Sequence, residues 1–291
     1  IPGNAGLLNA MDVLATGLNR INKLIIRITP LGVFGIAAAT AGTLSIGEMS
    51  RLQAYLLIYT LLVLLLSLVI LPLLITAVTP FRYRDLLSIP RDTIITIFAT
   101  AKIVVLLPQL VANIKQLFDR YQLEDDESDT AAEVLLPLAY PFPNLGTYLV
   151  LMFVPFSAWY LGRAMDWPDL ITFQAAALLS SFVAPIIGIP FLLDIARIPT
   201  DMMELFVMST VYTDRLRVVL GAAHLLTLAI IAIAINRGLF RVNWPRLGKV
   251  CLLSAALLAG SLLGVRVYLG SVLEGSYQGD SALLHMHWME R

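Results

Sequence analysis

Lys102 is a candidate functional residue because it carries a charge within a long apolar stretch. It is the one charged side chain between Thr93 and Ile114, and Pro108 follows it closely. A charge at the centre of a bilayer costs about 2.5–3.5 kcal/mol on insertion scales, so such a side chain usually pairs or faces water. Lys102 is therefore predicted to bind a solute carboxylate, or to stand with its ammonium where a coupling cation would lie. The alternative is a shallower position, with the side chain reaching the cytoplasmic interface.

A second candidate site lies in the proline-rich stretch PLAYPFPNLGTY, residues 137–148. Its three prolines and Gly146 predict unwound backbone, which a membrane tolerates only where it faces protein or a water-filled cavity. Asn144, Gly146 and Thr147 are candidate ligands, since carbonyls and a hydroxyl suit a substrate or a sodium ion near Asn144 and Gly146. The alternative is a kinked helix whose freed carbonyls are satisfied by neighbouring helices.

Two arginines and a histidine form the third group of candidates. Arg215 and Arg217 are candidate carboxylate ligands, because a guanidinium can donate two parallel hydrogen bonds. The alternative is that they pair with nearby carboxylates of Asp201, Glu204 or Asp214. His224 is a candidate proton carrier, and the alternative is a hydrogen-bonded packing histidine.

The other titratable residues give weaker evidence of a functional site. Asp194 and Arg197 are predicted to form a local ion pair, and His285 and His287 are interpreted as loop residues because further metal ligands are missing beside them. No nucleophile–base pair, metal-ligand spacing or phosphate-binding loop points to an enzyme. The net charge of zero gives no reason to expect nucleic acid as a partner.

The composition indicates an integral membrane protein in contact with lipid. Of 291 residues, 58% are hydrophobic and 14% are charged, whereas soluble domains have about 45–50% apolar and about 25% charged residues. Since about 20 residues cross the hydrocarbon core as a helix, several uncharged stretches predict multiple spans: 52–81, 134–162, 170–193 and 218–236. The single Cys251 excludes an internal disulfide.

The order of breaks and spans predicts a transporter. A long helix is expected over 7–43 and a span over 52–79, with the basic segment 80–92 on the cytoplasmic side. Residues 93–118 and 170–200 are each predicted to enter the membrane and return as a broken hairpin. A pair of such interrupted apolar segments is typical of inverted-repeat secondary transporters with a site at the midplane.

The remaining predicted elements complete the topology. A broken span is expected over 132–162 and an intact one over 203–236. Basic residues after 236 place that end in the cytoplasm, so a final span, about 248–270, leaves the tail outside. We expect the sequence to be a segment of a longer protein.

The stretch LLNAMDVLATGLNRINKLIIRITPLGVFGIAAATAG, residues 7–42, resembles the fifth helix of the dicarboxylate/amino acid:cation symporters, bacterial relatives of the glutamate transporters. FATAKIVVLLP lies where this family has a serine-rich hairpin tip, and PLAYPFPNLGTY where it has its NMDGT motif. The resemblance covers about residues 7–236. It implies an all-α transmembrane, glutamate-transporter-like fold with two re-entrant helical hairpins, a broken seventh helix and, in this chain, an extra C-terminal span.

The resemblance also implies a division of the chain and a function. Residues 1–80 correspond to family helices five and six, 81–236 to the transport core, and 237–291 add a cytoplasmic loop, the extra span and an extracytoplasmic tail, suited to fusion with a solute-binding domain. Family members are trimers that carry dicarboxylates or acidic amino acids by alternating access, coupled to Na⁺ or H⁺. The expected location is the bacterial cytoplasmic (inner) membrane.

Departures from the family's motifs bear on that function. Lys102, Ile103 and Val104 replace serines of the hairpin tip, and Leu145 stands where the sodium-binding aspartate would be. The family's substrate aspartate and arginine and its sodium-site asparagine and aspartate align with four residues without ionisable groups: Val218, Gly221, Leu225 and Ala229. The alternative function is therefore a transceptor or scaffold that no longer transports.

Overall fold

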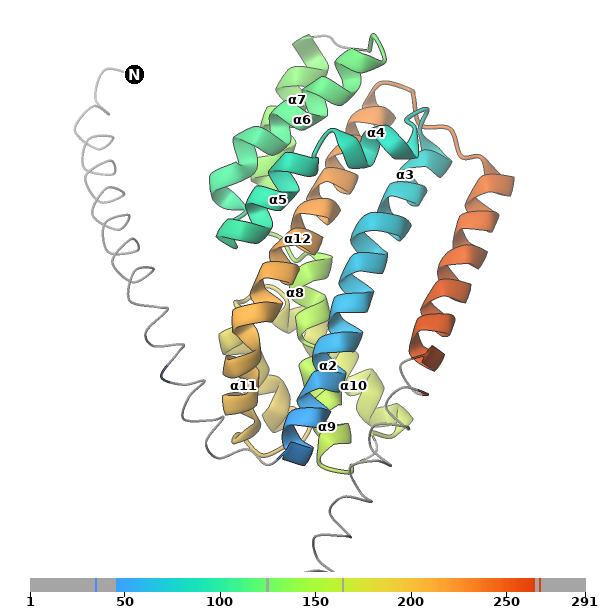
Figure 1. Ribbon diagram of the computed structural model, residues 1–291. Helices are drawn as coiled ribbons and strands as arrows, with labels where there is room; N and C mark the ends of the chain where they lie inside the picture. The colour runs from blue at the N-terminus through green and yellow to red at the C-terminus, as the bar shows by residue number, and fades with distance from the viewer. Residues whose placement is uncertain (1–34, 36–45, 124–125, 164, 265–266, 268–291) are drawn as a thin grey trace, which may run out of the picture. The chain divides into compact units, whose positions relative to one another are not determined.

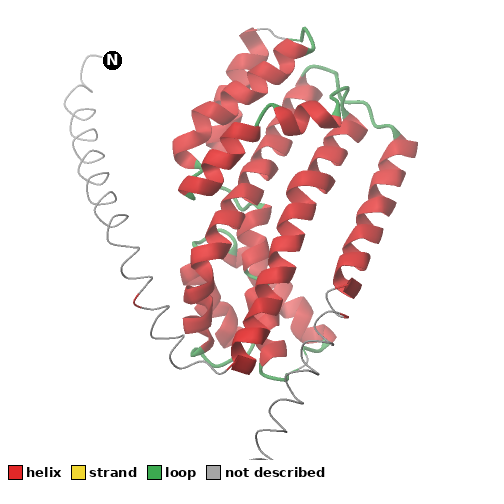
Figure 2. Ribbon diagram, in the orientation of Figure 1, coloured by secondary structure: helices red, strands yellow, loops and turns green. Residues whose placement is uncertain are grey.

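A computed structural model describes residues 35, 46–123, 126–163, 165–264 and 267 of this chain, with side chains described for 52–123, 130–163, 165–264 and 267. Figure 2 shows helices joined by loops, with no strand among these residues. The helix expected over residues 7–43 and the tail with its two histidines lie outside the described part. The all-α prediction is confirmed for the rest.

The first described span is one long helix with a wide turn inside it. It consists of α2 (Ile46–Leu64), the π-helix η1 (Leu65–Ile70) and α3 (Leu71–Val78). Pro72 has no N–H to donate to the carbonyl of Leu68. The hydroxyl of Tyr83 donates to that carbonyl oxygen instead, at 2.6 Å.

The length of this helix agrees with the span predicted over 52–79. Its apolar part, Leu52–Val78, has 27 residues, more than the roughly 20 that a crossing needs.

The stretch containing Lys102 is broken into two short helices. After α4 (Tyr83–Ser88) come α5 (Arg91–Thr100), a 3-10 turn η2 (Val104–Leu106) and α6 (Leu107–Arg120). We call residues 91–120 the first hairpin.

The chain reverses within this hairpin. Ala101 ends α5 in a left-handed conformation, with φ of 53°, and Pro108 fits the first turn of α6 because its missing N–H is not needed there. Asn113 in α6 donates to the carbonyl of Ile89 at 3.4 Å. The second helix therefore returns beside the start of the first.

The next stretch is broken as the sequence predicted, but over a shorter length. Helix α7 (Asp126–Ala139) ends before the unwound residues 140–144, and α8 (Leu145–Val150) and α9 (Phe153–Tyr160) follow. Pro137 lies inside α7 and Gly146 inside α8, so neither belongs to the break.

A second hairpin follows, formed by α10 (Trp167–Ser180) and α11 (Pro185–Ile195), which pack against each other. Residues 181–184 connect the two helices. Pro185 is the first residue of α11, where a proline costs no hydrogen bond. Gly188 and Pro190 were expected to break this stretch. They lie within α11 instead, so the break comes earlier than predicted.

Helix α12 (Met202–Asn236) has 35 residues and is the centre of the described part (Figure 1). It packs against α2, α3, α5, α7 and α8. Its buried apolar side chains join those of α6 and α7 in one hydrophobic core. The intact span predicted over 203–236 is confirmed.

A last apolar helix, Trp244–Gly264, has 21 residues, enough to cross a membrane. The loop before it is hydrogen-bonded to the end of α3. The N–H of Arg241 donates to the carbonyl of Val78 at 2.9 Å, and the N–H of Asn243 donates to the carbonyl of Ala77 at 3.1 Å. This helix is the predicted extra span, although its expected end at 270 lies outside the described residues.

Candidate functional site

Gly221, on α12, marks the place where two of the chain breaks meet. A Cβ atom added there would lie 3.1 Å from Cδ1 of Ile103, at the tip of the first hairpin, and 2.9 Å from Oδ1 of Asn144, in the break before α8. The hairpin tip, the broken helix and α12 therefore touch at one point. We call Lys102, Ile103, Asn144, Gly146 and Gly221 the convergence site.

Gly146 allows α8 to rest directly on the backbone of α12. A Cβ atom at this position would lie 2.1 Å from the carbonyl oxygen of Arg217 and 3.0 Å from the backbone nitrogen of Gly221. Only glycine avoids such an overlap. The structure thus gives Gly146 a packing role, whereas its predicted role as a ligand stays a prediction.

Asn144 and Thr147 begin α8 together. The side-chain oxygen of Asn144 accepts a hydrogen bond from the backbone N–H of Thr147 at 3.0 Å, which is the usual function of asparagine before the first turn of a helix. Thr147 is buried. Asn144 lies at the end of the predicted break, whereas Thr147 lies inside α8. The Asn144 amide oxygen is used in capping the helix, and the role of both residues as ligands stays a prediction.

Lys102 lies in the turn between α5 and η2, directly before Ile103. Its side chain is half-buried. Among the described residues it has neither an ion-pair partner nor a hydrogen-bond partner, which leaves its ammonium available to a ligand.

Arg215 binds the end of α5 rather than a carboxylate. Its Nη1 donates to the carbonyl oxygens of Phe98 and Ala99, at 3.2 and 2.7 Å. The last carbonyls of a helix lack partners within it, and a cation near them interacts favourably with the helix dipole. Neither alternative from the sequence anticipated this contact, although a helix that ends just before Lys102 needs a donor for these carbonyls.

Arg217 forms the ion pair that the sequence offered as an alternative to carboxylate binding. Its Nε lies 2.9 Å from Oδ1 of Asp214, one turn earlier on α12. The predicted pair between Asp194 and Arg197 is not formed, and that prediction is wrong. Helix α11 ends at Ile195, and Arg197 has a left-handed backbone with φ of 54°, so helical spacing does not hold between the two residues.

His224 lies on α12, three residues after Gly221, and is half-buried. Its Nδ1 is buried without a hydrogen-bond partner among the described residues. The packing alternative expected a hydrogen bond, which the described residues do not supply, so the role of His224 as a proton carrier stays a prediction.

The positions aligned with the family's ionic ligands are apolar and buried. Val218, Leu225 and Ala229 have exposures of 5%, 1% and 3% and belong to the hydrophobic core. None of these three side chains carries an oxygen atom.

Comparison with known proteins identifies most of the chain. A model of the sodium:dicarboxylate symporter family matches residues 3–235. No curated protein and no solved structure gives a significant match. The matched part ends with α12, so the helix Trp244–Gly264 lies beyond it.

Proposed function

The chain belongs to the sodium:dicarboxylate symporter family, and from this premise we propose that it carries a small anionic solute, such as a dicarboxylate or an acidic amino acid, by alternating access across a bacterial cytoplasmic membrane. The observation that supports an anionic solute is Lys102, a cation at a helix break without a partner among the described residues. A buried or half-buried ammonium gains most from a carboxylate that replaces its lost hydration.

The convergence site supports a transport mechanism because irregular backbone there comes from two separate chain breaks. In a membrane, such backbone is tolerated where it contacts protein or a water-filled cavity. Movement of the first hairpin tip away from Gly221 would open the space now filled by Ile103 and Asn144. The solute would then bind between Lys102 and α12.

We further propose that this protein is not coupled to sodium through the family's usual ligands. The apolar residues at the aligned positions, Leu145, Leu225 and Ala229, support this proposal. The fixed charge of Lys102 would stand in for a coupling cation, and His224, with its open Nδ1, would carry a proton. A homotrimer, the family's usual assembly, is part of the same proposal.

Flux into proteoliposomes tests the function. Uptake of labelled succinate or aspartate is measured under an imposed sodium gradient, proton gradient or neither. We expect saturable uptake by the unaltered protein and at least about a tenfold loss in Lys102→Gln, since one lost charge-assisted contact is worth about 1.5–3 kcal/mol. Lys115→Gln, in the same hairpin but paired with Glu133 at 2.8 Å, is the control and should retain uptake. Unsaturable flux that ignores both gradients would contradict the proposal.

A second function, a transceptor that binds solute outside without moving it, is favoured by one observation. The place of the family's substrate arginine is taken by Gly221, and the space beside it is filled by Ile103 and Asn144. If the full-length protein binds a solute and shows no flux under any gradient, this second function holds and transport does not.

A further inference from the structure

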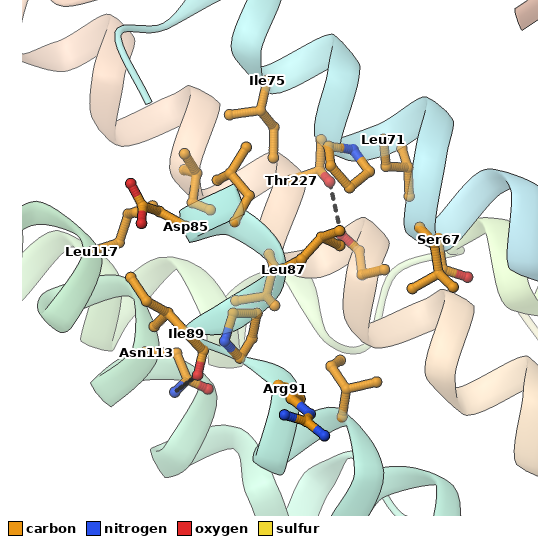
Figure 3. Close-up of a pocket in the computed structure, with 18 of the residues that line it drawn as sticks. Ser67, Leu71, Ile75, Asp85, Leu87, Ile89, Arg91, Asn113, Leu117 and Thr227 are labelled. Atoms are coloured by element: carbon orange, nitrogen blue, oxygen red, sulfur yellow. Dashed lines mark hydrogen bonds between the residues drawn. The ribbon is translucent and has the colours of Figure 1, made fainter. Parts of the chain in front are cut away.

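A separate cavity of about 350 Å³ lies between α3, the segment from α4 to α5, α6 and α12 (Figure 3). None of the residues of the convergence site lines it. Its volume falls within the roughly 300–1,000 Å³ typical of small-molecule sites. The first hairpin supplies one wall, and η1, α3, α4 and α12 supply the others.

The wall of this cavity is mainly aliphatic. Its few hydroxyl groups are used within their own helices: Ser67 donates to the carbonyl of Val63, and Thr227 to that of Ala223 at 2.7 Å. A ligand therefore meets few open polar groups there, and most of its surface must be apolar. The main aliphatic lining residues are Leu68, Leu71, Ile75, Leu86, Ile94 and Leu226.

The lining carries one acidic and one basic residue, and only the acidic one is paired within the described part of the chain. Asp85 accepts hydrogen bonds from Arg120 at 2.7 Å and from the hydroxyl of Tyr121 at 2.8 Å. Arg91, at the start of α5, is exposed and has no ion-pair partner among the described residues. The cavity is thus apolar, with one cationic side chain at its edge that no carboxylate of the described residues neutralises.

Asn113 adds an unsatisfied acceptor to the same wall. Its Nδ2 donates to the carbonyl of Ile89 at 3.4 Å, whereas its Oδ1 is buried without a partner. Buried acceptors normally have a donor. This oxygen is covered by protein atoms, so it does not contribute to the recognition of a carboxylate, which itself only accepts hydrogen bonds.

We infer that this cavity binds a single alkyl chain with an anionic head, specifically a free fatty acid. The guanidinium of Arg91 holds the carboxylate, and the alkyl chain lies against the aliphatic wall. A phospholipid fits less well, because it brings two chains to one cavity of this volume. Since both helices of the first hairpin line the cavity, the bound chain fixes that hairpin against α3 and α12.

Titration with dodecanoate tests this inference. The full-length protein is placed in phosphatidylcholine nanodiscs, and bound dodecanoate is counted by native mass spectrometry while the melting temperature is followed. We expect one saturable site and a melting temperature that rises with dodecanoate concentration, because the ligand binds the folded state. Dodecanol, which has the chain without the charge, should bind about tenfold more weakly.

Two pairs of variants distinguish the contribution of the ligand's carboxylate from that of its alkyl chain. Arg91→Gln should weaken dodecanoate binding about tenfold, whereas Arg84→Gln, an exposed arginine outside the lining, should not. Ala223→Phe adds a ring to the cavity wall and should abolish binding. Leu228→Phe, at an exposed position of the same helix, should leave it unchanged.

Three results would overturn the inference. They are equal binding of dodecanoate and dodecanol, binding that survives Ala223→Phe in a folded protein, and displacement of dodecanoate by phosphatidylglycerol added to the nanodiscs. If Ala223→Phe does not fold, the comparison of Arg91→Gln with Arg84→Gln still decides the role of the charge. None of these measurements requires transport, so the inference and the proposed function can fail separately.

Discussion

The two hairpins of this protein reverse the chain in different ways. The first is bound to the rest of the molecule: Arg215 of α12 holds the end of α5, and Ile103 packs on Gly221. At the base of this hairpin, opposite its tip, Arg120 at the end of α6 forms an ion pair with Asp85 of α4. Each of these contacts reaches an element outside the two hairpin helices.

The second hairpin is held mainly by its own two helices. Helix α11 approaches α10 so closely that a Cβ atom at Gly188 would lie 3.3 Å from the carbonyl oxygen of Ser180. Nine large apolar side chains of this hairpin are exposed, against four on the first, so the second presents the larger apolar surface to lipid or protein. The nine are Trp167, Ile171, Leu178, Leu179, Phe182, Val183, Ile186, Ile187 and Phe191.

Two similarly interrupted apolar segments are therefore stabilised by different interactions. The first hairpin depends on hydrogen bonds and close contacts to α12, and the second on packing within itself. Substitutions at matched positions of the two hairpins should therefore have unequal effects.

The largest effect is expected where α8 rests on α12. Gly146→Ala would place a methyl group 2.1 Å from a backbone oxygen that cannot move aside, and it should lower the free energy of unfolding by about 3 kcal/mol or more. Gly188→Ala, in the second hairpin, meets its nearest atom only at 3.3 Å. It should cost about 1 kcal/mol or less, because alanine also favours the helix. Thermal unfolding in detergent measures both, and equal losses would contradict the closer approach of α8 to α12.

A smaller effect is expected at Gly221, whose near neighbours are side chains. Gly221→Ala should cost about 1–3 kcal/mol. Combining it with Ile103→Ala, which removes the contacting Cδ1 atom, should cost less than the sum of the two single changes, because the contact is shared. A double-mutant cycle of unfolding free energies measures this coupling, and simple additivity would show that the hairpin tip does not touch α12.

Removal of the arginine that holds α5 should have a local effect. Arg215→Gln loses the donor to the carbonyls of Phe98 and Ala99 and should cost about 1 kcal/mol at this exposed site. Amide hydrogen exchange should rise in the last turn of α5. Arg163→Gln is the matched change, because it removes the donor to the carbonyl of Arg197, which follows α11. In this variant, amide hydrogen exchange should rise only near the second hairpin.

The smallest effect is a dependence on pH at the base of the first hairpin. The hydrogen bond from Tyr121, with support from Arg120, lowers the pKa of Asp85. A lowered pKa contributes stability that is present above the ordinary value, near 4, and is lost as the pH falls through the folded-state value.

Comparison with Asp85→Asn isolates this contribution. Hydrogen exchange in α4 and α6 should be faster in Asp85→Asn than in the unaltered protein at pH 7, and the difference should shrink below about pH 4. The second hairpin should show no such change. A difference that stays constant over this range would exclude Asp85 as its source.

Much of the fold was predictable because apolar length and proline position act locally. The apolar parts of α2 to α3, of α12 and of the final helix were predicted within a few residues at their described ends, since length and charge alone set them. The edges of the breaks were not predictable in the same way. Pro137 and Pro190 both remain inside helices, because neighbouring helices can compensate the hydrogen bond that proline omits.

The candidate site was only partly predictable because its partners are distant in sequence. The capping position of Asn144 follows from a local preference. The contact of Arg215 with Ala99 joins residues 116 positions apart, and no spacing rule relates them. The close approach of Gly146 to α12 likewise depends on how two helices meet in space.

The wide turn at Leu65–Ile70 has a consequence for how this protein tolerates change. A π turn holds one residue more than regular helix, which amounts to a rotation of about 100° between the two halves. If the same residues were wound as a regular helix, Leu71 and Ile75 would turn by about that angle away from the cavity that they line. Deletion of one residue from this turn would instead allow a regular helix that keeps both side chains on the cavity side, so the wide winding, more than the identity of its residues, selects which face of the helix is turned inward.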